Sequence, residues 1–186
     1  MPEGWEGRVW LDSRMTVPAP SVVAALDEAG LDYRVITHTA PVRSLAEAAA
    51  ARGVDVVDVV KTLVVRRGED DYLFVLVPGG RQISWPKLRA LLAVSRMSMP
   101  PADEAFAATG FERGTITPLG STRAWPVVAD LVVASRGEVT LGSGTHEVAI
   151  GVDARALLEA VAATIADVTE PERARRVVVQ TWRGPM

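Results

Sequence analysis

Two apolar runs separated by a short polar turn constrain the fold of this chain more than any other feature. Residues 61–67 (KTLVVRR) and 72–79 (YLFVLVPG) are rich in β-branched and aromatic side chains, and the stretch GEDD lies between them. Runs of this kind joined by a short glycine-containing turn are typical of antiparallel strands. The fold is therefore expected to contain a sheet built on this pair.

Helical patterns and further strands surround the pair. Residues 20–30 place apolar side chains at helical spacing, and in residues 44–53 (SLAEAAAARG) Ser44 and Glu47 form a capping-box pattern that ends at Gly53. Further helices are expected at 86–93, 100–110 and 153–165. Further strands are expected at 33–38, 81–84 and 126–134, and on both sides of the Gly-Ser-Gly-Thr turn at 142–145.

This order of elements predicts an α/β (α+β) fold, in which a mixed, mostly antiparallel sheet is flanked by helices. A chain of 186 residues is expected to form one domain with a substantial core. We divide it into an N-terminal extension (residues 1–18), the domain (residues 19–168) and a C-terminal tail (residues 169–186). Within the tail, residues 176–186 (RVVVQTWRGPM) are either one more strand or a loose end.

Composition excludes several classes of site. The chain has no cysteine and only two histidines, His38 and His146, so thiolate chemistry and a histidine-rich metal centre are excluded and no metal or cofactor is expected. The net charge of −3 provides no strong overall field towards nucleic acid, although a local basic patch is compatible with it. No apolar run reaches the roughly 18 residues of a membrane span, and no signal-peptide pattern opens the chain. We expect a cytoplasmic protein without membrane contact.

Common catalytic motifs are also missing. The sequence contains no G-x-S-x-G elbow, no Walker-type lysine loop, no H-E-x-x-H pair and no dinucleotide fingerprint after a strand. Candidate chemistry must therefore come from less familiar features.

The first such feature is Lys61, a cation that interrupts the apolar run DVVKTLVV. One interpretation is a lysine at a strand edge that extends its ammonium into solvent. The other is a positioned ammonium that faces a phosphate or a developing oxyanion.

The second feature is the segment GFERGTITPLG, residues 110–120, which combines three glycines, a proline and several hydroxyl groups. It is either a turn that ends the preceding helix or a surface on which backbone N–H groups meet a ligand.

Taken together, the segments resemble one family, the YbaK-type aminoacyl-tRNA deacylases, which are related to the editing domain inserted in bacterial prolyl-tRNA synthetases. The resemblance runs from about Ser21 to Ala162. It rests on the order and spacing of THTAPVRSLAEAA, VVKTLVV, LVPGGRQISWPKL, TGFERGTITPLG with its G-x-x-x-P core, WPVVAD and GSGTHEVAIGV.

The resemblance implies a YbaK-like editing domain that hydrolyses a wrongly attached amino acid from tRNA. It implies catalytic roles for Lys61 and for Gly114, whose loop would present backbone N–H groups to the scissile ester. The 3′ end of aminoacyl-tRNA would be the substrate, and an aminoacyl-tRNA synthetase is a further candidate partner. The substrate-binding residues expected from this resemblance are Thr115, Ile116, Thr117, Pro118, His38, Ser143, Gly144 and His146.

The sequence departs from the family pattern at Ala149, where many relatives carry an aspartate in the late strand. The attached amino acid therefore stays open among cysteine, alanine, serine and proline. Binding to tRNA is expected to depend on a few local cations such as Lys61, Lys87 and Arg89. Two other interpretations remain: a tRNA- or synthetase-binding module of the same fold without significant catalysis, and an interaction protein that uses the tryptophans of the N-terminal extension.

Overall fold

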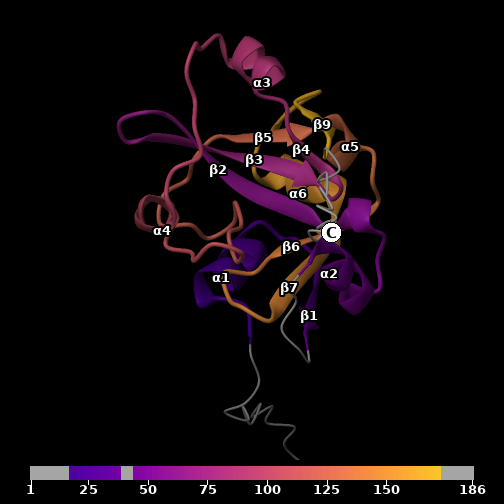
Figure 1. Ribbon diagram of the computed structural model, residues 1–186. Coiled ribbons are helices and arrows are strands. Elements are labelled where there is room, and N and C mark those ends of the chain that lie inside the picture. Colours follow the sequence, from indigo (N-terminus) through magenta and orange to yellow (C-terminus); the bar gives the residue numbers. More distant parts are fainter. Residues whose placement is uncertain (1–16, 39–43, 173–186) are drawn as a thin grey trace, which may run out of the picture.

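A computed structural model describes residues 17–38 and 44–172, and its centre is a four-stranded sheet with the order β2-β3-β5-β8 (Figure 1). Strands β2 and β3 pair in antiparallel fashion, which confirms the predicted hairpin. Strands β5 and β8 add in parallel, so the sheet is mixed. The strands are β2 (Val60–Gly68), β3 (Asp71–Pro78), β5 (Val127–Asp130) and β8 (Thr164–Ala166).

Two smaller antiparallel sheets complete the strands of the described part of the chain. The first has the order β1-β7-β6 and comprises β1 (Tyr33–Thr37), β7 (Val148–Asp153) and β6 (Glu138–Gly142). The second pairs β4 (Arg81–Ile83) with β9 (Thr169–Pro171). Strand β9 lies in the segment that the sequence assigned to the C-terminal tail, and residues 173–186 lie outside the described residues, as do residues 1–16 with their tryptophans.

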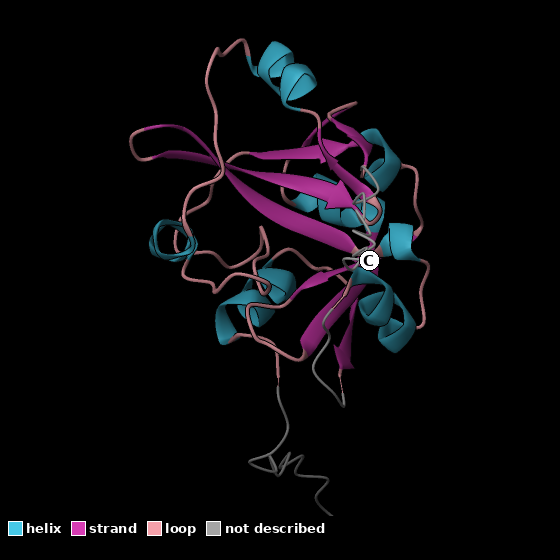
Figure 2. Ribbon diagram, viewed as in Figure 1, coloured by secondary structure: helices cyan, strands magenta, loops and turns pink. Residues whose placement is uncertain are grey.

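Six α-helices and one 3-10 helix are found in the described ranges, and they cover the sheets from several sides (Figure 2). Helix α2 shows why the predicted ends hold: the Ser44 hydroxyl accepts from the Glu47 amide at 3.1 Å, and Gly53 ends the helix with φ 68°. The helices are α1 (Pro20–Glu28), α2 (Leu45–Arg52), η1 (Val56–Asp58), α3 (Trp85–Leu92), α4 (Ala102–Thr109), α5 (Leu131–Ala134) and α6 (Ala154–Ala160).

The core lies on both faces of the four-stranded sheet. Alternate side chains of β3 point to opposite faces, and both sets are buried. Phe74 and Leu76 pack with side chains of α1, α6 and the three-stranded sheet, whereas Val75 and Val77 pack with Leu88 of α3. Because β2 is an edge of this sheet, residues of β2 can line a cleft beside it.

Two predicted elements differ from the structure. The strand expected at 126–134 ends at Asp130, because the Asp130 carboxylate caps a helical turn by accepting from the Val132 amide at 3.0 Å. The helix expected at 153–165 ends at Ala160, and residues 164–166 instead form β8, which pairs with β5. Both errors concern short apolar segments, whose patterns suit a helix as well as a strand. A local cap decides the first segment, and pairing with β5 decides the second.

The structure also bears on the expectation of no membrane contact. Within the described ranges, no helix combines the length and the apolar character needed to cross a membrane.

Candidate functional site

A cleft of about 910 Å³ lies beside the edge strand β2. Its walls come from the end of β1, from α2, from the start of α4, from the loop at 110–120 and from the turn between β6 and β7, elements that can be followed in Figure 1. Of the residues predicted for the site, the cleft brings together Lys61, Gly114, Ile116, His38 and His146.

Lys61 lies at the start of β2, and its side chain is 27% exposed. The ammonium donates to the Arg81 carbonyl oxygen at 2.6 Å and to Oε1 of Glu172 at 2.5 Å. An ammonium has three N–H donors, so one remains for a ligand. The lysine is therefore a positioned cation with a carboxylate neighbour, and not one that extends freely into solvent.

The loop at 110–120 presents two of its residues, Gly114 and Ile116, to the cleft. Gly114 has φ 96°, a conformation that side chains other than glycine rarely adopt, and a Cβ there would meet nothing within 4 Å. The amide of Thr115 donates to the Glu112 carbonyl at 3.0 Å, whereas the amides of Gly114 and Ile116 have no partner among the described residues. These two N–H groups can donate to a ligand.

Close packing on strand β6 holds this loop in place. A Cβ built on Gly142 would lie 2.5 Å from the Thr115 carbonyl oxygen and 2.6 Å from that of Ile116. Only a residue without a side chain lets the loop approach the strand this closely. The turn contributes a further bond, from the Gly144 amide to the Thr115 carbonyl at 2.9 Å.

The other predicted site residues lie near the cleft without lining it: Thr115, Thr117, Pro118, Ser143 and Gly144. Three of these residues are buried and form hydrogen bonds between their hydroxyls and nearby backbone groups: Thr115, Thr117 and Ser143. The Ser143 hydroxyl, for example, donates to the Val148 carbonyl at 2.9 Å, and the Thr117 hydroxyl accepts from the Leu119 amide at 3.4 Å. In this structure these residues shape the two turns that border the cleft.

His38 follows β1 and forms a polar group with Arg52 of α2. The Arg52 guanidinium donates from Nε to Nε2 of His38 at 3.4 Å and from Nη1 to the Thr140 hydroxyl at 3.1 Å. Burial and the nearby guanidinium lower the pKa of His38, more than Glu147 raises it, so the ring is neutral at pH 7. Since Nε2 accepts from Arg52, the proton is on Nδ1, which is buried and has no partner in the described part of the chain.

His146 lies at the rim of the cleft, where its side chain is 61% exposed. Its Nε2 lies 2.8 Å from Oε2 of Glu112, so the pair joins the turn between β6 and β7 to the loop at 110–120. Glu147, the next residue, also lines the cleft and has φ 64°. The rim therefore holds an imidazole and two carboxylates.

Several residues of the cleft were missed by sequence reasoning. Arg52, Thr62 and Arg113 line it, and Thr62 is buried with a hydroxyl that has no partner among the described residues. Arg113 lies in the loop at 110–120 and Thr62 follows Lys61, so their position next to these motifs could have identified them as site residues. Arg52 carried no signal, because only folding brings the end of α2 to this cleft.

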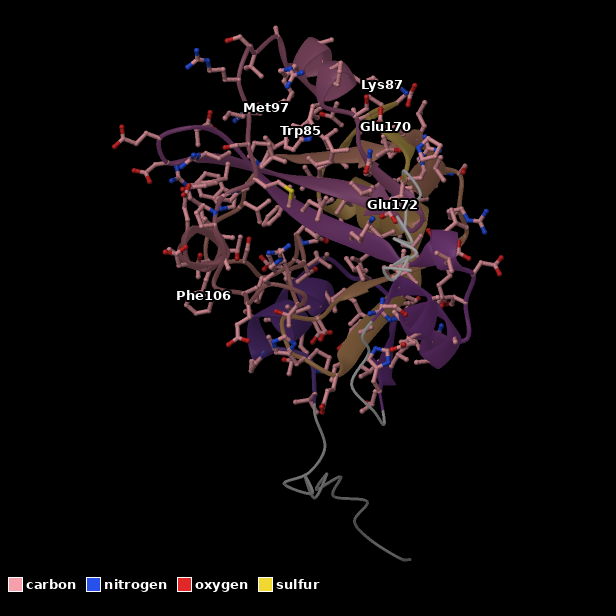
Figure 3. The ribbon with its side chains drawn as sticks, viewed as in Figure 1. Trp85, Lys87, Met97, Phe106, Glu170 and Glu172 are labelled. Carbon is pink, nitrogen blue, oxygen red and sulfur yellow. The ribbon has the colours of Figure 1, made fainter. Side chains whose placement is uncertain are left out.

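Two cations proposed from the sequence do not line the cleft, Lys87 and Arg89 on α3. Lys87 donates to the Asp167 carboxylate at 2.8 Å and to the Thr169 carbonyl at 3.1 Å. Figure 3 shows Lys87 of α3 far from Phe106 of α4, the helix whose start borders the cleft.

Ala149, where the sequence departs from the family pattern, is structural: it is fully buried in β7 opposite Ile36 and does not line the cleft. Asp130 is also structural, because it is buried and its Oδ2 accepts from the amides of Val168 and Thr169.

The acidic and imidazole side chains do not form a metal site within the part of the chain that is described. No group of three or more His, Cys, Asp or Glu side chains there is placed to hold a metal ion. The polar groups that the described residues present at the cleft include an ammonium, two free amides, two guanidiniums, the His38 and His146 imidazoles and the Glu147 carboxylate.

Known proteins share sequence and fold with this chain. Residues 39–160 match the family model described as aminoacyl-tRNA editing domain. The proline–tRNA ligase of Thermosipho melanesiensis is 34% identical over 97 residues, which are 52% of this chain and 17% of the ligase. That of Trichlorobacter lovleyi is 30% identical over 115 residues, 62% of this chain and 20% of the ligase. The chain thus spans about a fifth of the length of these ligases.

Solved structures cover more of the chain. A candidate trans-editing enzyme for prolyl-tRNA synthetase superposes with a TM-score of 0.75 and 28% identity, over 83% of this chain and 99% of that one. A hypothetical protein superposes with a TM-score of 0.75 and 29% identity, over 81% and 99%. The chain therefore belongs to the aminoacyl-tRNA editing domain (YbaK) family, which is related to the editing domains of prolyl-tRNA synthetases.

Proposed function

We propose that this protein is a trans-editing hydrolase that removes a wrongly attached amino acid from tRNA. The observation that carries the proposal is that Lys61, Gly114 and Ile116 line one cleft of an editing-domain fold, the latter two with amides that have no partner among the described residues. One of the relatives in structure is described as a candidate trans-editing enzyme for prolyl-tRNA synthetase. Mischarged tRNA for proline is therefore the first substrate to test.

Hydrolysis of an aminoacyl ester does not require a strong nucleophile from the protein, because the ester is already activated towards attack by water. Water attacks the acyl carbon, the bond from that carbon to the ribose oxygen breaks, and the ribose oxygen takes up a proton. The neighbouring ribose hydroxyl assists the attacking water. The protein contributes position and electrostatic stabilisation, which are large terms in acyl transfer.

In this mechanism the amides of Gly114 and Ile116 donate to the tetrahedral oxyanion. The third N–H of Lys61 donates to the ester carbonyl or to the same oxyanion as charge develops. Loss of one donor of this kind costs about 10²- to 10³-fold in rate. Glu172 keeps the Lys61 ammonium at a fixed place, since the two groups are 2.5 Å apart.

The pairing of Lys61 with Glu172 also favours a second function. A lysine whose charge is balanced by a carboxylate stabilises an oxyanion less than an unpaired lysine does. A cleft with such a lysine would bind a tRNA end or a synthetase without significant catalysis. Turnover separates the two functions.

A panel of mischarged tRNAs tests the proposal directly. Alanine, cysteine and serine attached to tRNA for proline, and proline attached to a non-cognate tRNA, are incubated with the purified protein, with and without EDTA. We expect hydrolysis of at least one ester above the rate in buffer, at the same rate with EDTA. Binding without hydrolysis of any ester would support the binding module, and loss of activity in EDTA with recovery on zinc would contradict the metal-free mechanism.

A further inference from the structure

The cleft is positive although the whole chain carries a net charge of −3. Among the described residues, three cationic side chains line it, Arg52, Lys61 and Arg113, against one lining carboxylate, that of Glu147. Glu172 balances the charge of Lys61, so the excess of positive charge comes from Arg52 and Arg113. A concave surface with an excess of one charge concentrates ligands of the opposite charge. An anionic group of the ligand is therefore expected here.

The partners of Arg52 are neutral, which distinguishes it from Lys61. Its guanidinium donates to the His38 ring and to the Thr140 hydroxyl, and no carboxylate among the described residues pairs with it. The side chain is partly buried in the last turn of α2, where the helix dipole favours a cation. Burial lowers the pKa of Arg52, yet an arginine in a protein stays charged. The result is a fixed, uncompensated positive charge with free N–H groups.

Arg113 gives a second cation of this kind on another wall. It is exposed, directly precedes Gly114 in the loop, and has neither an ion pair nor a hydrogen bond with any described residue. The two free amides of the loop, those of Gly114 and Ile116, follow it by one and three residues in the chain. A ligand whose ester lies at these amides therefore passes close to Arg113.

The chemistry of the proposed substrate identifies the anion. An aminoacyl ester has no free carboxylate, and its α-amino group is cationic, so the only negative charges that such a ligand brings are its phosphates. A guanidinium is suited to phosphate because its planar fork matches two phosphate oxygens. A free carboxylate, as in an amino acid, would not explain two separate cations.

We propose that Arg52 binds the phosphate that joins the terminal nucleotide to the preceding one, and that Arg113 contacts the next phosphate of the single strand. The inference rests on the proposed function for the identity of the ligand. Arg52, the fixed cation, sets how deeply the RNA end enters the cleft, and Arg113 guides the strand over the rim. His38 acts through Arg52 as a positioning residue, since its neutral ring accepts from the guanidinium.

The test measures binding rather than turnover. An RNA hairpin that ends in a single-stranded CCA and carries no attached amino acid is titrated with the full chain over a series of salt concentrations. The variants are Arg52→Gln, Arg52→Lys and Arg113→Gln, with Arg155→Gln as the control. Arg155 is an arginine on α6 that pairs with Glu159, is 85% exposed and does not line the cleft.

We expect Arg52→Gln to weaken binding by about tenfold or more at low salt, the usual loss for a charged hydrogen bond. The slope of log affinity against log salt should become shallower by about 0.7 in Arg52→Gln and in Arg113→Gln, since each loses one phosphate contact to a single strand. Arg52→Lys should keep the slope, because it keeps the charge. Arg155→Gln should bind like the unaltered protein.

The outcomes separate this inference from the proposed function. An unchanged slope in both Arg52→Gln and Arg113→Gln overturns the inference, even if the protein hydrolyses mischarged tRNA. Arginine-dependent binding without hydrolysis of any ester supports the inference and overturns the hydrolase. If thermal melts show that Arg52→Gln is unfolded, Arg113→Gln, an exposed substitution, decides the test.

Discussion

Replacement of Gly142 by alanine tests whether strand β6 holds the loop at 110–120 in its working position. The new Cβ would lie 2.5 Å from the Thr115 carbonyl oxygen, and ordinary contact begins at 3.4 Å, so the loop must move by about 0.9 Å. The backbone of Gly142 is not in the left-handed region, so the effect is steric. A displacement of about 1 Å at a reacting centre can cost 10²-fold in rate, and overpacking costs about 1–3 kcal/mol of stability.

Single-turnover deacylation and thermal unfolding of Gly142→Ala are measured together. We expect the rate to fall by about 10²-fold and the free energy of unfolding to fall by about 1–3 kcal/mol. Gly137→Ala is the matched control, because a Cβ there meets nothing within 4 Å and the glycine has no positive φ. If Gly142→Ala lost stability but hydrolysed ester at the unaltered rate, the loop amides would not be the groups that stabilise the transition state.

Two further predictions concern stability. Asp130→Ala should lower the free energy of unfolding by about 3–5 kcal/mol, since the buried carboxylate accepts from three backbone amides. The control Asp153→Ala, which loses one exposed cap bond, should lower it by about 1 kcal/mol. Equal losses of the two variants in urea denaturation would contradict this reasoning. The Tyr72 hydroxyl donates to Glu104 at 2.7 Å, and this bond raises the pKa of Tyr72 to about 12. Folding favours the neutral form of Tyr72, so the contribution of this hydrogen bond to the free energy of unfolding is complete below pH 10 and is lost as the pH rises to about 12. Tyr72→Phe should therefore flatten that part of the pH–stability curve. A curve unchanged by the substitution would refute the assignment.

Local sequence patterns predicted the elements whose ends are defined locally. The hairpin of β2 and β3 followed from two apolar runs and a polar turn, and the ends of α2 followed from Ser44 and Gly53. The segments at 131–134 and 164–166 were wrong because their apolar patterns suit either structure. A cap from Asp130 made the first helical, and pairing with β5 made the second a strand.

The same distinction applies to the candidate site. Lys61 and Gly114 stood out because a cation in an apolar run and a glycine in a polar loop are visible along the chain, and both line the cleft. Arg52 could not be found in this way. Its proposed role in phosphate binding depends on the absence of a carboxylate partner among the described residues. It also depends on the bond to Thr140, which is 88 residues away in the sequence.

The sequence also could not show what balances the charge of Lys61. Glu172 follows strand β9, whose pairing with β4 brings it to the start of β2 (Figure 3). The sequence places this segment in the C-terminal tail, because nothing in residues 169–172 predicts a strand without its partner. Strand β9 itself is only three residues long, which is below the length at which patterns are informative.

The central claim is that ester hydrolysis takes place in this cleft with the help of Lys61, and the chain offers an unusually clean test. It contains two lysines, Lys61 in the cleft and Lys87 outside it, each paired with a carboxylate. The decisive measurement is the single-turnover rate of deacylation of the best mischarged tRNA by Lys61→Ala and Lys87→Ala, with melts of both. We predict a loss of at least about tenfold for Lys61→Ala alone, with both variants folded. Hydrolysis by folded Lys61→Ala at the rate of Lys87→Ala would contradict the account.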